Sequence, residues 1–130
     1  MTIAMIDLDF FKKVNDSYGH EVGDQVLKIL ADVLKSQLRK SDILSRFGGE
    51  EFVIVLPETP VEGAKMVLNK VREYLSKVEI SSPLGKSFSV TLSGGVAGGD
   101  ISEFETYHDL LRMADKNLYE AKHSGRNCII

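Results

Sequence analysis

Two pairs of acidic residues stand beside apolar runs in the sequence: Asp7 with Asp9, and Glu50 with Glu51. The first pair closes the run TIAMIDLD, and the second precedes the run FVIVL. Residues two apart in a strand share a face, so the first pair is predicted to point the same way. Carboxylates that converge without matching cations favour a hard divalent ion, Mg²⁺ first and Mn²⁺ as an alternative.

Glycines and lysines near these acids suggest phosphate chemistry. Gly48 and Gly49 would let backbone N–H groups approach a phosphate closely, and Lys12 and Lys13 follow the first acidic pair. Metal, backbone donors and lysine together are the apparatus of phosphoryl or nucleotidyl transfer. Acidic turns next to strands are also common as solvated surface, and the pattern alone leaves that alternative open.

The elements that would position these residues follow from hydrophobic periodicity. Strands are predicted at 2–9, 42–47, 51–58 and 87–99, with a short final strand in NCII. Helices are predicted from Val22 to near Arg39, from Pro60 onward, and over 110–121. The order β-α-β-β-α-β-α-β predicts a ferredoxin-like α+β fold, with a central, mostly antiparallel sheet flanked by helices.

Composition narrows the class of protein. The 130 residues are 43% hydrophobic, enough for one core, so residues 1–130 are predicted to form a single domain. A net charge of −3 argues against a nucleic acid polymer as partner. The only cysteine cannot form an internal disulfide, and no apolar run reaches the roughly 20 residues that span a bilayer. We expect a cytoplasmic domain without membrane contact.

Four segments in order resemble the GGDEF-domain diguanylate cyclases, in the GGEEF variant. They are DLDFFKKVNDSYGHEVGDQVL, RFGGEEF, VTLSGGVA and ADKNLYEAKHSGRN, and the resemblance covers nearly the whole chain. The resemblance implies the nucleotidyl-cyclase palm form of the predicted fold. It also implies that two GTP molecules condense to cyclic di-GMP and two pyrophosphates. One site binds one GTP, so catalysis would require a homodimer with two sites face to face.

The resemblance also assigns the metal residues. Asp7 and Glu50 are expected to bind Mg²⁺ through their carboxylates, with the backbone carbonyl of Leu8 as a further ligand. Glu51 is expected to help with a second metal. Glu50 is in addition the expected proton acceptor for the attacking hydroxyl, although the metal could acidify that hydroxyl unaided.

By the same resemblance, Asn15 and Asp24 read guanine by accepting hydrogen bonds from its N1–H and amino group. Without the resemblance, Asp24 would be an ordinary acid at a helix N-terminus, where the helix dipole favours it. His20 matches a substrate contact, with a capping or packing role as the alternative. The expected phosphate-binding residues are Phe10, Phe11 and Lys12 in the first turn, Gly48 and Gly49 in the hairpin, and the late cations Lys122 and Arg126. The last two are four residues apart, so a helix would present both on one side. Both phenylalanines could equally be core residues, and at least one of them is expected to be.

An R-x-x-D motif, RKSD at 39–42, precedes the hairpin at the spacing of the family's inhibitory site. The resemblance implies that cyclic di-GMP binds there and inhibits the enzyme. The planar guanidinium of Arg39 can donate two parallel hydrogen bonds to a phosphate or to a guanine edge, and Asp42 can accept a hydrogen bond from guanine N1–H. Lys70 is a weaker candidate for a second cation of this site.

The sequence departs from the family at its start. The family's domain normally begins with a helix and a segment resembling D-x-L-T-G-L-x-N-R, and this sequence begins directly at the first strand. An N-terminally truncated domain is expected to expose an apolar patch and to self-associate or lose stability. Two alternatives to the enzyme stay open: a catalytically silent module that binds GTP or cyclic di-GMP, and a more distant palm relative with another product.

Overall fold

A computed structural model describes residues 1–99 and 107–130 of the chain. Its centre is a four-stranded sheet in the order β2-β3-β1-β6, in which every neighbouring pair is antiparallel. The strands are β1 (Thr2–Leu8), β2 (Ile43–Arg46), β3 (Glu51–Leu56) and β6 (Leu92–Gly98). The predicted α+β fold with a mostly antiparallel sheet is therefore confirmed.

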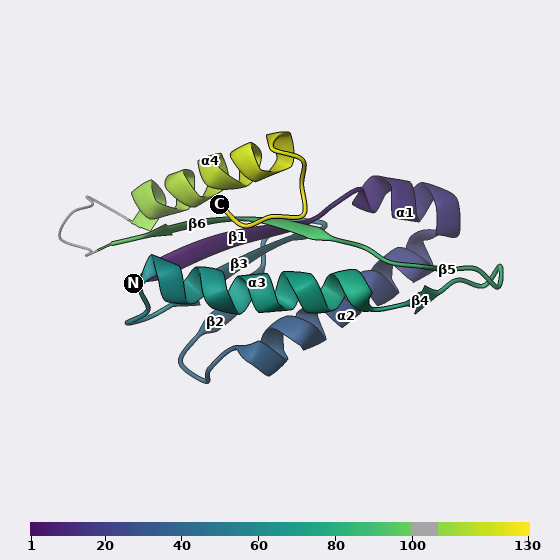
Figure 1. The fold of residues 1–130 in the computed structure, drawn as a ribbon, viewed down its shortest axis with the longest axis horizontal. Helices are drawn as coiled ribbons and strands as arrows, with labels where there is room; N and C mark the ends of the chain where they lie inside the picture. Colours follow the sequence, from purple (N-terminus) through teal and green to yellow (C-terminus); the bar gives the residue numbers. More distant parts are fainter. Residues whose placement is uncertain (100–106) are drawn as a thin grey trace.

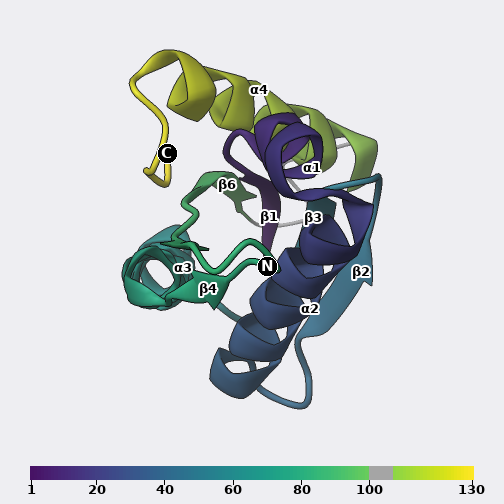
Figure 2. The same ribbon diagram turned by 90° about the vertical axis from the view of Figure 1, so that its right-hand side faces the viewer.

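Helices cover both faces of this sheet (Figures 1 and 2). The long helices α2 (His20–Gln37) and α3 (Val61–Lys77) pack on one face, and α4 (Tyr107–His123) packs on the other. A short helix, α1 (Phe11–Tyr18), follows β1 directly. In the described part of the chain, no helix has the length and apolarity needed to cross a membrane.

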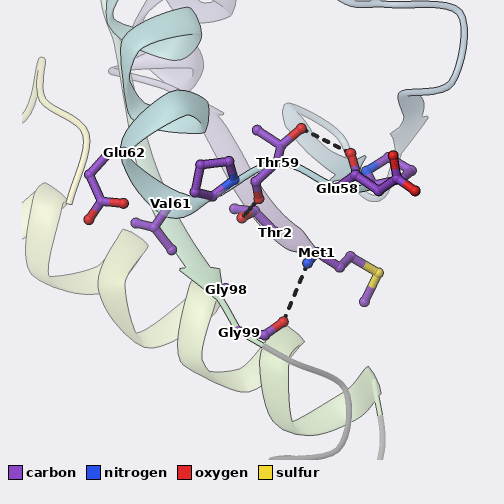
Figure 3. A pocket seen from close by; sticks show the side chains of 10 residues that line it. Met1, Thr2, Glu58, Thr59, Val61, Glu62, Gly98 and Gly99 are labelled. Carbon is purple, nitrogen blue, oxygen red and sulfur yellow. Dashed lines mark hydrogen bonds between the residues drawn. The ribbon is translucent and has the colours of Figure 1, made fainter.

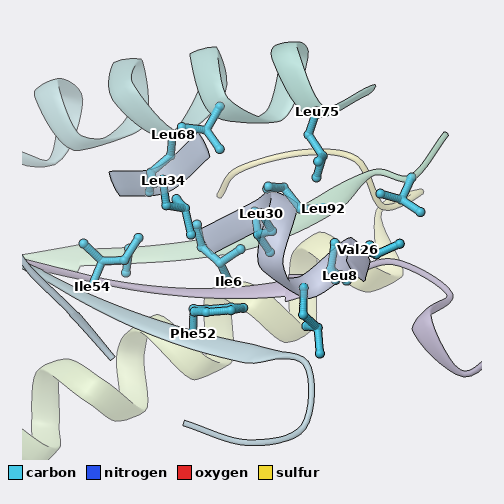
Figure 4. Close-up of a cluster of buried hydrophobic side chains, with 14 of the residues drawn as sticks. Ile6, Leu8, Val26, Leu30, Leu34, Phe52, Ile54, Leu68, Leu75 and Leu92 are labelled. Atoms are coloured by element: carbon cyan, nitrogen blue, oxygen red, sulfur yellow. The ribbon is translucent and has the colours of Figure 1, made fainter. Parts of the chain in front are cut away.

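The core lies in two layers because successive strand residues point to opposite faces. Ile6 and Leu8 of β1 belong to the cluster shared with α2 and α3, whereas Ile3 and Met5 belong to the cluster shared with α4. Figure 4 shows the first cluster, in which side chains of the strands meet those of the two long helices. Because both faces of β1 are buried, its sequence is a nearly continuous apolar run rather than an alternation of polar and apolar residues.

The α4 helix lies directly on β6 because Gly95 carries no side chain. A Cβ atom at Gly95 would lie 2.1 Å from the carbonyl oxygen of Ala114 and 2.1 Å from the amide nitrogen of Leu118. Asn117 of the same helix donates a hydrogen bond to the carbonyl of Val96, with 2.8 Å between nitrogen and oxygen. These contacts fix the middle of α4 against β6, the strand that pairs with β1.

Three elements differ from the sequence prediction. Helix α1 was not predicted, because it has eight residues and only Val14 is fully buried. The predicted strand 87–99 is two strands: β5 (Ser87–Phe88) pairs with β4 (Ile80–Ser81) in a separate hairpin, and only β6 joins the main sheet. The final NCII forms a single parallel bridge, from Ile129 to Gly94, rather than a full strand.

Candidate active site

The acidic residues of β1 and of the hairpin meet at one end of the sheet. In the antiparallel pairing of β1 with β3, Asp7 lies opposite Glu51. Residues directly opposite each other point to the same face with Cβ atoms about 5 Å apart. Glu50 is the residue before β3 and is half-buried. The register of the sheet therefore brings Asp7 next to the hairpin acids, and Glu51 is its direct partner.

Asp7 holds a buried carboxylate, with 3% of the residue exposed. Its pKa is raised from 3.8 to about 6, chiefly by burial and also by the charges of Glu50 and Glu51, while Lys122 lowers it. Lys122 of α4 donates a hydrogen bond to Oδ2 of Asp7, and the two side chains form an ion pair. The other oxygen, Oδ1, is buried and has no hydrogen-bond partner.

These residues fit a divalent metal. Within residues 1–99 and 107–130, no three His, Cys, Asp or Glu side chains form a ready-made metal cluster. Mg²⁺ is nonetheless commonly held by one or two carboxylates together with substrate phosphates and water. The unpartnered oxygen of Asp7, beside glutamates that raise its pKa, matches that kind of site. Lys122 supplies the positive charge that a metal ion would otherwise bring.

Asp9 shares this end of the sheet but takes no part in the acidic cluster. Its Oδ1 accepts a hydrogen bond from Ser93, and its Oδ2 accepts from Thr91 and from the backbone N–H of Asn127. The residue is 3% exposed. Both carboxylate oxygens are occupied, so Asp7 is the residue of this pair that is available to a metal.

The turn between β1 and α1 is the expected phosphate-binding turn. Phe10 precedes α1 with a φ of 57°, in the left-handed region, and the residue is 60% exposed. Phe11 packs partly against the core, and Lys12 is exposed. The guanidinium carbon of Arg126 lies 4.6 Å from the centroid of the Phe10 ring, a cation–π contact. The turn therefore has Lys12 and Arg126 beside it.

The expectation that Lys122 and Arg126 lie on one side of a helix is wrong. Helix α4 ends at His123, and Gly125 takes a φ of 103° that an L-residue rarely adopts. The N–H of Arg126 bonds back to the carbonyl of Ala121, with 3.1 Å between nitrogen and oxygen, as in a Schellman-type helix end. Lys122 therefore reaches Asp7 from the helix, while Arg126 reaches Phe10 from the segment after it.

The hairpin between β2 and β3 contains Gly48 and Gly49, both exposed. Neither has a φ in the left-handed region, and a Cβ at Gly49 would meet nothing within 4 Å. The fold itself therefore does not require glycine at position 49. Arg46, which the sequence analysis did not single out, donates to the carbonyls of both glycines and braces the loop.

Asn15 on α1 and Asp24 on α2 occupy neighbouring helices that pack together. Oδ1 of Asn15 is buried without a hydrogen-bond partner. It is accommodated because the adjacent residue of α2 is Gly23, where a Cβ would lie 1.9 Å from that oxygen. Asp24 is exposed, and His20 is exposed at the first position of α2. Gly23 is a residue that sequence reasoning missed, since its role depends on a contact between two helices.

Asp24 also lines a groove of about 450 Å³ between α2 and the β2–β3 hairpin. The groove combines the apolar side chains of Leu27 and Phe52 with the cations Lys28 and Arg46. Asn15 does not line this groove, so the groove contains only one of the two expected guanine-reading residues.

The R-x-x-D motif forms a tight turn at the end of α2. The backbone N–H of Arg39 donates to Oδ2 of Asp42, at 2.8 Å, and its guanidinium pairs with Oδ1 at 3.3 Å. The same guanidinium donates to the carbonyl of Pro57 and to the hydroxyl of Thr59. The Asp42 side chain is only 3% exposed, whereas that of Arg39 is 57% exposed. Arg39 is thus the accessible member of the motif.

Pro57 and Thr59 also line a hollow of about 700 Å³ at the start of β1 (Figure 3). It lies beside Thr2, at the opposite end of the strand from Asp7. Five residue steps of a strand put roughly 17 Å between these two ends. Lys70 lines a separate groove between α2 and α3. The structure therefore places Arg39 with Asp42, away from the acidic cluster, and places Lys70 in another groove.

The fold and this arrangement define a palm-like α+β domain with an acidic site at one end of its sheet. The chain belongs to the family described as diguanylate cyclase, GGDEF domain, whose model matches residues 1–128. Diguanylate cyclase A of Treponema denticola is 41% identical over 127 residues, covering 98% of this chain and 34% of that protein. The response regulator PleD of Caulobacter vibrioides is 40% identical over 131 residues, covering 100% of this chain and 29% of that protein. This chain thus spans about a third of the length of these relatives.

Solved structures agree with this assignment. The active GGEEF domain of a diguanylate cyclase from Vibrio cholerae has a TM-score of 0.88 and 34% identity, covering 98% of this chain and 81% of that one. The GGDEF domain of DgcB from Caulobacter crescentus, in complex with c-di-GMP, has a TM-score of 0.92 and 30% identity, covering 98% of this chain and 75% of that one.

Proposed function

We propose that this chain is a Mg²⁺-dependent diguanylate cyclase domain that condenses two GTP molecules into cyclic di-GMP and two pyrophosphates. The observation that carries the proposal is the buried Asp7 carboxylate, with one unpartnered oxygen, set beside the hairpin acids of a GGEEF loop. A buried carboxylate near two others is costly unless a cation compensates for it. The family membership and the names of the relatives point to the same reaction.

Asp7 and Glu50 would hold the metal, with the Leu8 carbonyl as a further ligand and Glu51 available for a second ion. Bound Mg²⁺ would neutralise the phosphates and lower the pKa of a coordinated hydroxyl. With a metal on Asp7, Lys122 would be free of its ion pair with that carboxylate and would be available to the triphosphate. Mn²⁺ has similar ligand preferences and is an alternative ion.

The remaining residues would bind and orient GTP. Asn15 and Asp24 would accept hydrogen bonds from the N1–H and amino groups of guanine, and His20 would be a further contact. The N–H groups of Phe10 and Phe11, with Lys12 and Arg126, would hold the terminal phosphates near the start of α1, where the helix dipole favours negative charge. Backbone N–H groups of Gly48 and Gly49 would approach the triphosphate from the hairpin.

The chemical step joins two GTP molecules held by two copies of the domain. Each 3′-hydroxyl oxygen attacks the α-phosphorus of the other GTP, the bond from that phosphorus to the bridging oxygen breaks, and pyrophosphate leaves. The hydroxyl proton passes to Glu50 or to solvent. The two sites must face each other, so the active species is a two-fold symmetric homodimer, stable or transient.

We propose in addition that cyclic di-GMP inhibits the domain by binding at Arg39 and Asp42. Support comes from the exposed guanidinium of Arg39 and from its position at the far end of β1 from Asp7. A ligand there would compete with Pro57 and Thr59 for the same guanidinium. Lys70 is the least supported member of this site, since it lines a different groove.

The test is incubation of the domain with GTP and Mg²⁺, followed by separation of the nucleotides. The expected result is cyclic di-GMP with two pyrophosphates for each product molecule, and no turnover of ATP at a comparable rate. Glu50→Gln should lower the rate by a factor of about 100 or more. Glu62→Gln, an exposed acid in the first turn of α3, is the matched control and should retain the wild-type rate. Production of GDP alone, or equal turnover of ATP and GTP, would contradict the proposal.

A further inference from the structure

Asp9 is a buried acid that the proposed reaction does not use. Its carboxylate accepts hydrogen bonds from Ser93 at 2.6 Å, from Thr91 at 2.6 Å and from the backbone N–H of Asn127 at 3.0 Å. Its own N–H donates to the carbonyl of Thr91. None of the ion pairs in the described part of the chain involves Asp9. Hydrogen bonds alone therefore compensate for this buried charge.

The segment that Asp9 holds has an unusual backbone. Gly125, Arg126 and Asn127 have φ values of 103°, 62° and 47°, so three successive residues lie in the left-handed region. For the two residues that are not glycine, such conformations persist where surrounding contacts enforce them. The Asn127 N–H bonds to Asp9, and the Asn127 side chain accepts from Arg72 at 3.1 Å. Asp9 thus contributes one of the contacts that maintain this turn.

The turn determines where Arg126 lies. Its guanidinium stacks on the ring of Phe10, the residue that directly follows Asp9 in the chain. One carboxylate therefore links the first turn of the expected phosphate site to the segment that carries its late cation. Without that link, the turn that carries Arg126 would be held by fewer contacts, so ordering the Arg126 side chain on nucleotide binding would cost more free energy and weaken binding.

We propose that Asp9 is a positioning residue, which holds Arg126 over the Phe10 turn so that this cation faces the terminal phosphates of bound GTP. This inference rests on the proposed function. Asp9 contacts neither substrate nor metal in this proposal and acts through Arg126. The consequence is selective: loss of Asp9 should weaken binding of the triphosphate and leave binding of the guanine end unchanged.

The experiment uses Asp9→Ala, which removes both acceptor oxygens and leaves the Asn127 N–H without its carboxylate partner. Binding of GMP and of a GTP analogue with an α,β-methylene bridge is measured by calorimetry with Mg²⁺. Asp9→Ala should bind the analogue about tenfold more weakly and GMP within twofold of wild type. Asp115→Ala, at an exposed acid of α4, is the matched control and should change neither affinity.

A double-mutant cycle separates positioning from general support of the fold. If Asp9 acts through Arg126, Asp9→Ala combined with Arg126→Gln should bind the analogue no more weakly than Arg126→Gln alone. Additive losses, or equal losses for GMP and the analogue, would overturn the inference. If Asp9→Ala does not fold, Asp9→Ser, whose shorter side chain withdraws its oxygen from the Asn127 N–H, should show the selective loss, and wild-type affinity for the analogue would overturn the inference. Failure of the wild-type domain to bind the analogue would instead count against the proposed function.

Discussion

Replacing Asp7 by asparagine should make the metal-free domain more stable while it destroys the proposed metal site. The Asp7 pKa is raised from 3.8 to about 6, with burial as the largest cause. A carboxyl whose pKa is higher in the folded state binds its proton more tightly there. Its contribution to stability is therefore present below about pH 4 and is lost as the pH rises through 6.

The size of this effect follows from the pKa difference. The difference between 3.8 and about 6 corresponds to about 3 kcal/mol, lost from the free energy of unfolding once Asp7 is ionised in the folded state. Asparagine has the same shape without the charge, and Lys122, whose side chain is 29% exposed, can turn toward water. We expect Asp7→Asn to raise the free energy of unfolding by about 1 to 3 kcal/mol at pH 8, and by less than about 1 kcal/mol at pH 4.

Urea unfolding followed by circular dichroism, with a chelator present, measures these values at both pH values. Lys122→Met is the companion variant: it removes the cation that partly compensates for Asp7, so it should destabilise the domain at pH 8. Combining it with Asp7→Asn should remove that loss, because no buried charge then lacks a partner. The reasoning is refuted if Asp7→Asn is less stable than wild type at pH 8, or if its gain is the same at both pH values.

Three further predictions concern other parts of the structure. Gly23→Ala would place a Cβ 1.9 Å from Oδ1 of Asn15 and displace that side chain. The KM for GTP should therefore rise about tenfold, while the free energy of unfolding changes by less than about 1 kcal/mol. Unchanged kinetics would contradict the role given to Asn15. Gly95→Ala would force the backbone of α4 away from β6, so the free energy of unfolding measured by urea denaturation should fall by about 1 to 3 kcal/mol. An unchanged midpoint would contradict the close packing of α4 on β6. Arg39→Ala should raise the inhibition constant of cyclic di-GMP at least tenfold. Its initial rate with GTP should stay near wild type, and equal inhibition of both proteins would exclude Arg39 from the product site.

The long elements were predictable because their apolar residues repeat with a clear period. Helices α2, α3 and α4 each bury one stripe, and β1 is apolar throughout because both its faces are covered. The short helix α1 carries too few apolar residues to show such a period. The division of 87–99 into two strands depends on long-range pairing, since β5 pairs with β4 while β6 pairs with β1.

The sequence by itself determined the fold class and the candidate acids, since both depend on residue types at short spacings. It could not determine which acid is free for a metal, because that depends on partners far along the chain. Lys122 pairs with Asp7 across 115 residues, and Asn127 bonds to Asp9 across 118. Only the folded sheet brings these groups together, because the register of β1 with β3 and β6 and the seating of α4 on Gly95 decide which side chains meet.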